Sequence, residues 1–230
     1  MAAARDDAEL AHLVEQRVAG LPIEHIVGYA DFCGLRILVD PGVFVPRRRT
    51  EHLVAEALWL TTPGSVVVDL CCGSGALGVA VHAGQPGISL HAADLDPVAV
   101  ACARRNVEPL GGHVTQGNLY AALPPALRGR INVLLSNVPY VPTDEIRFLP
   151  TEARLHEPVT TLDGGTDGLA ILRLVAAEAA HWLAPGGSML AETSEAQAPV
   201  AAAILRAAGL TPRITTSDEL YATTVIGTKE

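Results

Sequence analysis

Aromatic residues are scarce in this sequence, making up 4% of its 230 residues. A protein that stacks nucleic-acid bases on several aromatic side chains is therefore not expected. Basic residues are also outnumbered: 16 Lys and Arg stand against 25 Asp and Glu, and the formal net charge is −9. Binding that relies on general neutralisation of phosphates needs the opposite balance. Both features argue against a nucleic-acid partner.

Long hydrophobic runs are missing as well. No apolar stretch approaches the roughly 18–20 residues that a membrane-spanning helix needs. The opening Met-Ala-Ala-Ala-Arg-Asp-Asp places acidic side chains where a signal peptide has its apolar stretch. The sequence therefore predicts a cytoplasmic protein with no membrane partner.

Cysteine and histidine do not form a metal-binding pattern. There are four cysteines, and none of them has the Cys-x-x-Cys spacing of a zinc site: Cys33, Cys71, Cys72 and Cys102. The eight histidines are scattered along the chain without ligand spacing. We expect free thiols in a reducing compartment and no metal site.

What the sequence does contain is an apolar fraction of 49%, ample for a sizeable core. Apolar runs and turn signals predict helices over residues 7–19, 51–60 (capped by Thr50), 76–81, 97–106, 169–183 (ended by Pro185-Gly186-Gly187) and 199–208. They predict a hairpin within residues 26–45, made of short β-rich pieces at 26–29, 35–39 and 43–45. They also predict strands over residues 66–68, 88–93, around 114, 131–136, 188–192, 211–216 and 221–227. Alternation of apolar strands with helices predicts an α/β fold with a parallel sheet covered on both faces. The last two strands lack an intervening helix and predict an antiparallel edge.

A glycine-rich turn follows the first strand of this α/β region. Gly73, Gly75 and Gly78 lie between that strand and a helix, an arrangement that exposes backbone N–H groups to a nucleotide-like ligand. Asp94 ends the second strand and can accept both hydroxyls of a ribose. Asp69 directly precedes the turn, where a carboxylate repels a pyrophosphate and favours a cationic ligand. The spacing Gly-x-Gly-x-x-Gly alone also fits an NAD-dependent oxidoreductase, against which Asp69 argues.

A second polar segment, Asn137-Val138-Pro139-Tyr140, follows the fourth strand at the edge where α/β sheets bind ligands. It resembles the Asn-Pro-Pro-Tyr motif of methyltransferases that use S-adenosylmethionine to methylate planar nitrogens. Such nitrogens are poor nucleophiles because their lone pair is delocalised. The Asn137 amide oxygen and a backbone carbonyl, expected at Val138, would accept hydrogen bonds from the two N–H groups as the nitrogen attacks. Tyr140 would cover the planar group.

Further blocks resemble the release-factor glutamine methyltransferase family from about residue 15 to the end. They are residues 19–28 (Ala-Gly-Leu-Pro-Ile-Glu-His-Ile-Val-Gly), 32–35, 43–51 (Val-Phe-Val-Pro-Arg-Arg-Arg-Thr-Glu), 155–158 and 162–169. The resemblance implies a class I, Rossmann-like methyltransferase with a seven-stranded, mostly parallel sheet in the order 3-2-1-4-5-7-6. We expect residues 1–45 to form a short helix and hairpin and residues 46–230 to form the methyltransferase domain.

The same resemblance implies the site. The cofactor would be S-adenosylmethionine, with S-adenosylhomocysteine as product, and it would contact Phe44, Pro46, Arg47, Asp69, Cys71, Gly73, Gly75, Asp94, Leu95, Asn118, Leu119 and Asn137. Asn137, Pro139 and Tyr140 would be catalytic, and Asn137, Val138, Pro139, Tyr140 and Glu157 would bind the substrate. Four positions depart from the usual family pattern: Cys71 replaces a frequent glycine, Asn118-Leu119 an Asp-aromatic pair, and Val138 a proline.

The expected substrate is a glutamine side chain of a protein, with a peptide chain release factor as the family's partner. Only about twenty residues precede the block at residues 19–28, where the family has a helical domain. Two alternative substrates therefore stay open: a small-molecule amine and an exocyclic amine of nucleic acid. Another alternative is a protein that binds the cofactor without catalysis, because Val138 removes the rigidity of a Pro-Pro pair. In the basic run 47–49, Arg48 and Arg49 fit a solvated loop end. Glu157, Asp163 and Asp167 lie in a long loop expected to act as a substrate lid.

Overall fold

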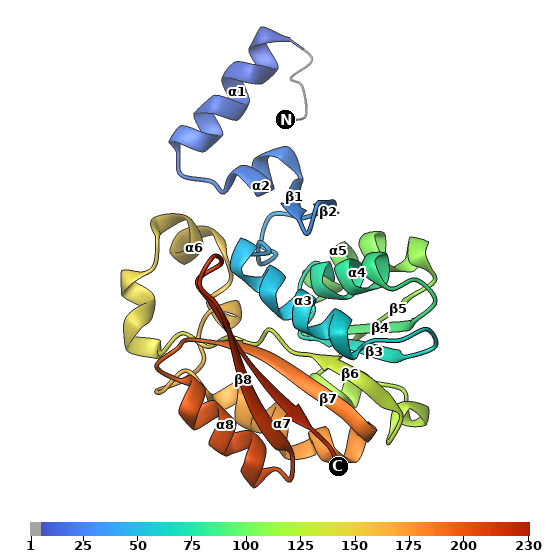
Figure 1. Ribbon diagram of the computed structural model, residues 1–230. Coiled ribbons are helices and arrows are strands. Elements are labelled where there is room, and N and C mark those ends of the chain that lie inside the picture. The colour runs from blue at the N-terminus through green and yellow to red at the C-terminus, as the bar shows by residue number, and fades with distance from the viewer. Residues whose placement is uncertain (1–5) are drawn as a thin grey trace.

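A seven-stranded sheet organises the chain (Figure 1). This computed structural model describes residues 6–230, so the expectation for the first residues lies outside it. The strands are β3 (Val66–Leu70), β4 (Ser89–Asp94), β5 (His113–Gln116), β6 (Ile131–Leu135), β7 (Leu183–Thr193), β8 (Thr211–Ser217) and β9 (Ala222–Thr228). Their spatial order is β5-β4-β3-β6-β7-β9-β8. This confirms the predicted order. The antiparallel strand is β9, which pairs with both β7 and β8.

Helices cover both faces of this sheet. Figure 1 shows α3 (Glu51–Leu60), α4 (Ala76–Gly84) and α5 (Pro97–Val107) on one side, and α7 (Ala170–Trp182) and α8 (Ala198–Ala207) on the other. Successive residues of β3 pack on opposite faces of the sheet: Val67 packs with the first group of helices and Val68 with the second. A strand buried on both faces must be apolar throughout, which is why β3 and β6 read as nearly continuous hydrophobic runs.

The N-terminal part differs partly from the prediction. Helix α1 (Asp7–Val18) is confirmed, and Asp6 caps it by accepting a hydrogen bond from the Glu9 N–H at 2.8 Å. Residues 26–27 end a short helix, α2 (Ile23–Val27), instead of beginning a strand. The hairpin is formed by β1 (Tyr29–Phe32) and β2 (Leu35–Leu38), and residues 43–45 are not a strand. Short apolar runs do not distinguish strand from helix, and this run was misassigned for that reason.

One local prediction about a helix start is wrong, and one about a helix end holds only in part, because α7 does end at Trp182. Thr50 precedes α3, but its side chain makes no capping hydrogen bond, and its hydroxyl is buried without a partner among the described residues. Pro185-Gly186-Gly187 lies inside β7 and does not form a separate stop after α7. The register between β6 and β7 shifts at this point, so the strand accommodates the three residues as an irregularity.

The predicted long loop after β6 is partly helical. It contains a 3₁₀ helix over residues 143–148 and α6 (Thr151–His156). Prolines precede both short helices, which supplies the extended backbone from which each begins. Within the described residues, no helix is long and apolar enough to span a membrane.

Candidate functional site

The glycine turn joins β3 to α4 and is held by the end of β4. The Gly73 N–H donates to Asp94 Oδ2 at 2.8 Å, and the Cys72 N–H donates to the Ala93 carbonyl at 3.0 Å. A Cβ at Gly75 would meet Val107 Cγ2 at 2.8 Å, and one at Gly78 would meet Leu90 Cδ1 at 2.9 Å. The spacing of these two glycines therefore reflects close packing of α4 and the turn against β4 and α5.

Two carboxylates flank this turn. Asp69 is fully buried, and its Oδ2 accepts from the Gly78 N–H at 2.9 Å, while Oδ1 has no partner among the described residues. Burial raises the pKa of Asp69 to about 7, with a contribution from the nearby charge of Asp94. Burial also raises the pKa of Asp94, against the hydrogen bonds that it accepts from the backbone of residues 73 and 96.

This pair of carboxylates suits a cation. An unpaired, buried carboxylate oxygen carries a desolvation cost that a positively charged hydrogen-bond donor would offset. A pyrophosphate would instead be repelled by two negative groups. The residues therefore fit a ligand that carries an ammonium and a ribose, as S-adenosylmethionine does, better than a dinucleotide.

The residues expected at the adenine lie at the ends of neighbouring strands. Leu95, just after β4, is 65% exposed, so its apolar side chain is free to pack on a ring. Asn118 follows β5 and is exposed, and Leu119 has a positive φ of 47°. Their roles at a ligand stay predictions.

Cys71 has an unusual backbone. Its φ is 60°, in the left-handed region where residues with a Cβ are strained. Burial, together with the charges of Asp94 and Asp69, raises the pKa of its thiol to about 12. A thiol with that pKa is not a nucleophile at neutral pH, which agrees with the expected lining role. Among the described residues all four cysteines are free.

Because the backbone at Cys71 is strained, we expect glycine at this position to be more stable than alanine, the reverse of their order inside a helix. Cys71→Ala and Cys71→Gly both remove the sulfur, but only glycine also relieves the left-handed conformation. We expect Cys71→Gly to be more stable than Cys71→Ala by about 1 kcal/mol in urea unfolding. Cys102 is the matched control because it lies within α5, where alanine should be the more stable by a similar amount. The same order at both positions would show that residue 71 is unstrained.

The segment after β6 presents an unused amide. Asn137 is half-buried, and its side chain has no hydrogen-bond partner among the described residues, nor does the carbonyl of Val138. Val138 itself is buried and packs in the same core as α7, which anchors the segment although the first proline of the motif is replaced. Pro139 is half-buried beside it. Both acceptors named from the sequence are thus available.

Tyr140 belongs to a polar cluster that the sequence reading missed. Its hydroxyl donates to Glu192 Oε1 at 2.6 Å, and the Arg49 Nε–H donates to the same oxygen at 2.9 Å. Arg49 also lies over the Tyr140 ring, 5.7 Å from its centre. Arg49 is therefore an ion-pair partner, although its side chain is still 46% exposed, and the predicted solvated loop end describes it only in part. Arg48 is exposed, as predicted. The sequence does contain a sign of this cluster: Glu192 is a carboxylate at the end of an apolar strand, as Asp69 and Asp94 are.

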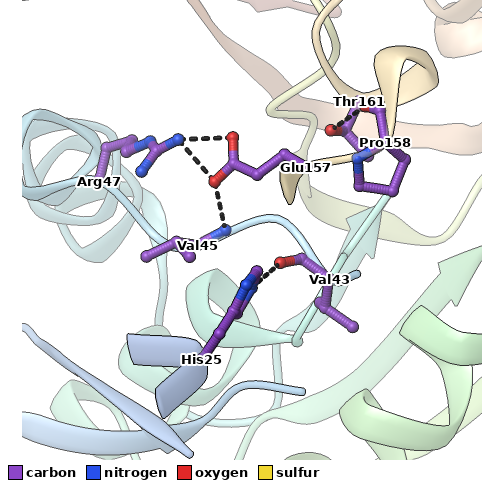
Figure 2. A network of polar contacts seen from close by, with 7 residues as sticks. All are labelled: His25, Val43, Val45, Arg47, Glu157, Pro158 and Thr161. Atoms are coloured by element: carbon purple, nitrogen blue, oxygen red, sulfur yellow. Dashed lines mark hydrogen bonds and ion pairs between the residues drawn. The ribbon is translucent and has the colours of Figure 1, made fainter. Parts of the chain in front are cut away.

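Figure 2 shows a second network, around Glu157. Both carboxylate oxygens of Glu157 accept from the Arg47 guanidinium at 2.6 Å, and Oε1 also accepts from the Val45 N–H at 3.2 Å. On the other side, His25 Nε2 donates to the Val43 carbonyl at 2.9 Å. Glu157 is buried, and its pKa is raised by burial although Arg47 opposes the shift.

This network fixes the segment that carries Phe44, Pro46 and Arg47, because it is bonded to α2 on one side and to residue 157 on the other. The Arg47 guanidinium also lies 4.9 Å from the centre of the Phe44 ring. Glu157 thus holds this segment through hydrogen bonds. Its contact with a substrate stays a prediction.

The expected lid is tied to the Asn137 segment. Gln197 Nε2, just before α8, donates to the Tyr140 and Asp167 carbonyls at 2.9 Å each. Asp163 Oδ1 accepts from the Thr143 hydroxyl at 2.7 Å, and Asp167 pairs with Arg173. Hydrogen bonds from Arg173 and the Leu169 N–H lower the pKa of Asp167 to about 2, so that it is ionised at neutral pH. Both aspartates shape the lid through hydrogen bonds.

Comparisons with known proteins place this chain among methyltransferases. The family model "Methyltransferase small domain" matches residues 34–165. The release factor glutamine methyltransferase of Geobacter sulfurreducens is 35% identical over 94% of this chain and 75% of its own. A 4-amino-L-phenylalanine/4-methylamino-L-phenylalanine methyltransferase of Streptomyces pristinaespiralis is also 35% identical, over 86% of this chain and 70% of its own. The crystal structure of a methyltransferase from Pyrococcus furiosus superposes with a TM-score of 0.63 at 16% identity, covering 97% and 99% of the two chains.

Proposed function

Because the chain belongs to the release factor glutamine methyltransferase family, we propose that it methylates a glutamine side-chain amide of a protein. The methyl donor would be S-adenosylmethionine, and a peptide chain release factor is the substrate suggested by its relatives' names. The observation that carries the proposal is the unengaged Asn137 amide and Val138 carbonyl, two acceptors at the sheet edge beside a site suited to a cationic cofactor.

The chemistry follows from those acceptors. The cofactor, when bound, supplies a methyl group on a positively charged sulfur. Asn137 and the Val138 carbonyl would accept the two N–H groups of the substrate amide and orient its nitrogen towards that methyl carbon. These fixed dipoles would stabilise the positive charge that develops on the substrate nitrogen, and that nitrogen would then lose a proton to water. Tyr140, held by Glu192, would cover the amide plane.

Identification of the acceptor tests this function directly. Cell lysate is incubated with the protein and isotope-labelled S-adenosylmethionine, and labelled peptides are located by mass spectrometry. Label on a glutamine side chain supports the proposal. Label confined to other residues or to nucleic acid contradicts it.

A second candidate is methylation of a small aryl amine, favoured by the similarity to the 4-amino-L-phenylalanine enzyme. An aniline nitrogen presents two N–H groups on a planar system, so the same two acceptors would serve it. Parallel assays with a glutamine peptide and with 4-amino-L-phenylalanine distinguish the candidates by their kcat/KM values.

The buried carboxylate of Asp69 should make stability depend on pH. In the unfolded chain its pKa is near 3.9, and burial raises the folded value to about 7. Below about pH 4 both states are protonated and the group contributes nothing; as the pH rises towards 7 the unfolded state ionises first, so the free energy of unfolding falls by up to about 4 kcal/mol. In Asp69→Asn, the free energy of unfolding measured with urea should no longer show this decrease between about pH 4 and pH 7. Asp31→Asn, at an exposed position, is the control. Identical pH profiles for Asp69→Asn and the parent would contradict the raised pKa.

A further inference from the structure

An open groove of about 1060 Å³ adjoins Tyr140 on the side of β7. It lies between the end of β7, the residues leading into α8 and the turn that joins β8 to β9, and residues 143–148 line its remaining side. The Tyr140 ring and Glu192 belong to its lining. The groove is therefore continuous with the segment that we propose holds the methyl acceptor, and a substrate longer than one side chain would run into it.

The charge of the groove is strongly negative. Its lining contains one guanidinium, that of Arg49, and five carboxylates: Glu145, Asp167, Glu192, Glu195 and Asp218. Arg49 pairs with Glu192, and Asp167 pairs with Arg173. The other three have no ion-pair partner among residues 6–230 and face solvent. Several like charges around one hollow favour a cationic occupant and attract it from a distance.

Glu192 supplies an independent reason to expect a cation. The side chain is 3% exposed, and its Oε1 accepts from both Arg49 and Tyr140. Its Oε2 is buried and has no hydrogen-bond partner in the described part of the chain. An unsatisfied buried carboxylate oxygen is costly, so a donor brought by a ligand at this wall of the groove would be strongly favoured.

Two exposed aromatic side chains border the same groove. Phe148 is 73% exposed at the end of the 3₁₀ helix, where the Arg147 guanidinium lies 4.7 Å from the centre of its ring, and Tyr221 is 91% exposed at the turn before β9. Tyr221 also has a positive φ of 50°, which a residue with a Cβ adopts only at some cost. Aromatic faces beside carboxylates bind the aliphatic stem and charged end of a lysine or arginine side chain.

We propose that this groove binds a lysine or arginine side chain of the protein substrate, a few residues from the methylated glutamine. The proposal rests on the proposed function for the identity of the occupant, and on the groove's carboxylates, the unpaired Glu192 oxygen and the exposed Tyr221 ring for its chemistry. A basic residue near the glutamine is thus a determinant of which glutamine is recognised.

Peptide binding tests this without requiring turnover. Fluorescent peptides carry one glutamine in a glycine-serine background, with a single lysine moved through each position on either side, and their affinity is measured by anisotropy with S-adenosylhomocysteine present. One or two lysine positions should bind at least about 10-fold more tightly than the lysine-free peptide. Glutamate at those positions should abolish the gain, and added salt should reduce it. Equal affinity for the lysine, neutral and glutamate peptides would overturn the proposal.

Charge reversal in the groove locates the contact. Asp218→Lys should weaken the best lysine peptide by about 10-fold, and it should restore binding of the glutamate peptide. Glu108→Lys makes the same change of charge next to β5, at the opposite edge of the sheet, and should leave both affinities unchanged. Equal losses in the two variants would mean that only net charge matters and would contradict a specific site.

The outcomes separate this inference from the proposed function. Methylation of glutamine with no preference for a neighbouring lysine leaves the function standing and rejects the groove. Selective binding of lysine peptides that is reversed by Asp218→Lys, without methylation of any glutamine, supports the groove as a cation site and rejects the proposed function.

Discussion

Replacing Asn137 by alanine should lower kcat on the identified acceptor by roughly 10²–10³-fold, the cost of losing one preorganised polar contact in a transition state. The side-chain oxygen of Asn137 is free of partners within the described structure, so its removal breaks no other hydrogen bond. Cofactor affinity should change much less, because most of the expected cofactor contacts come from β3, β4 and the glycine turn. Single-turnover rates and calorimetric titration with the cofactor measure the two effects separately.

Asn137→Asp is the sharper control for this prediction. It keeps an acceptor oxygen at nearly the same place and should retain measurable activity. If residue 137 were needed only for the shape of the turn, Asn137→Ala and Asn137→Asp would have about equal effects on activity. Full turnover in Asn137→Ala would show that the segment is only a turn and that another group accepts the substrate N–H.

Asp94→Ala should weaken cofactor binding about 10- to 150-fold, which corresponds to the roughly 1.5–3 kcal/mol of hydrogen bonds to a charged group. Asp94 is expected to accept the ribose hydroxyls, and in the structure it also holds the glycine turn through the Gly73 N–H. Calorimetry with S-adenosylmethionine and with NAD gives the affinity of each. Binding of NAD by the parent chain, without binding of S-adenosylmethionine, would contradict the cofactor assignment.

Asp94→Asn separates the two roles of this residue. An asparagine can still accept the Gly73 N–H and support the turn, but it loses the acceptor for the Asp96 N–H and presents a single acceptor oxygen to the ribose. We expect both the melting temperature and the cofactor affinity of this variant to lie between those of the parent and Asp94→Ala. If its affinity equals the parent's, the ribose lies elsewhere.

Local sequence was sufficient for much of the fold and for naming the residues that we expect at the cofactor, whose roles stay predictions. The order of strands and helices could be predicted because buried strands, glycine turns and amphipathic helices leave their patterns within a few residues of each other. Asp69, Asp94 and the Asn137 segment were recognisable for a related reason: each directly follows or ends an apolar strand, and parallel strands bring such ends to one edge. The resemblance to the family supplied the strand order, which periodicity does not contain.

Contacts between distant segments were decided only by the tertiary structure. Glu157 bonds to Arg47 across 110 positions, and Glu192 joins Arg49 across 143 positions, so no local pattern announces either pair. In the sequence alone, Arg49 belongs to a basic run that looks solvated. Folding places it against a buried carboxylate, and burial makes that contact decisive because a charge removed from water must find a partner. The groove beside Tyr140, likewise, exists only once β7, the β8–β9 turn and residues 143–148 are brought together.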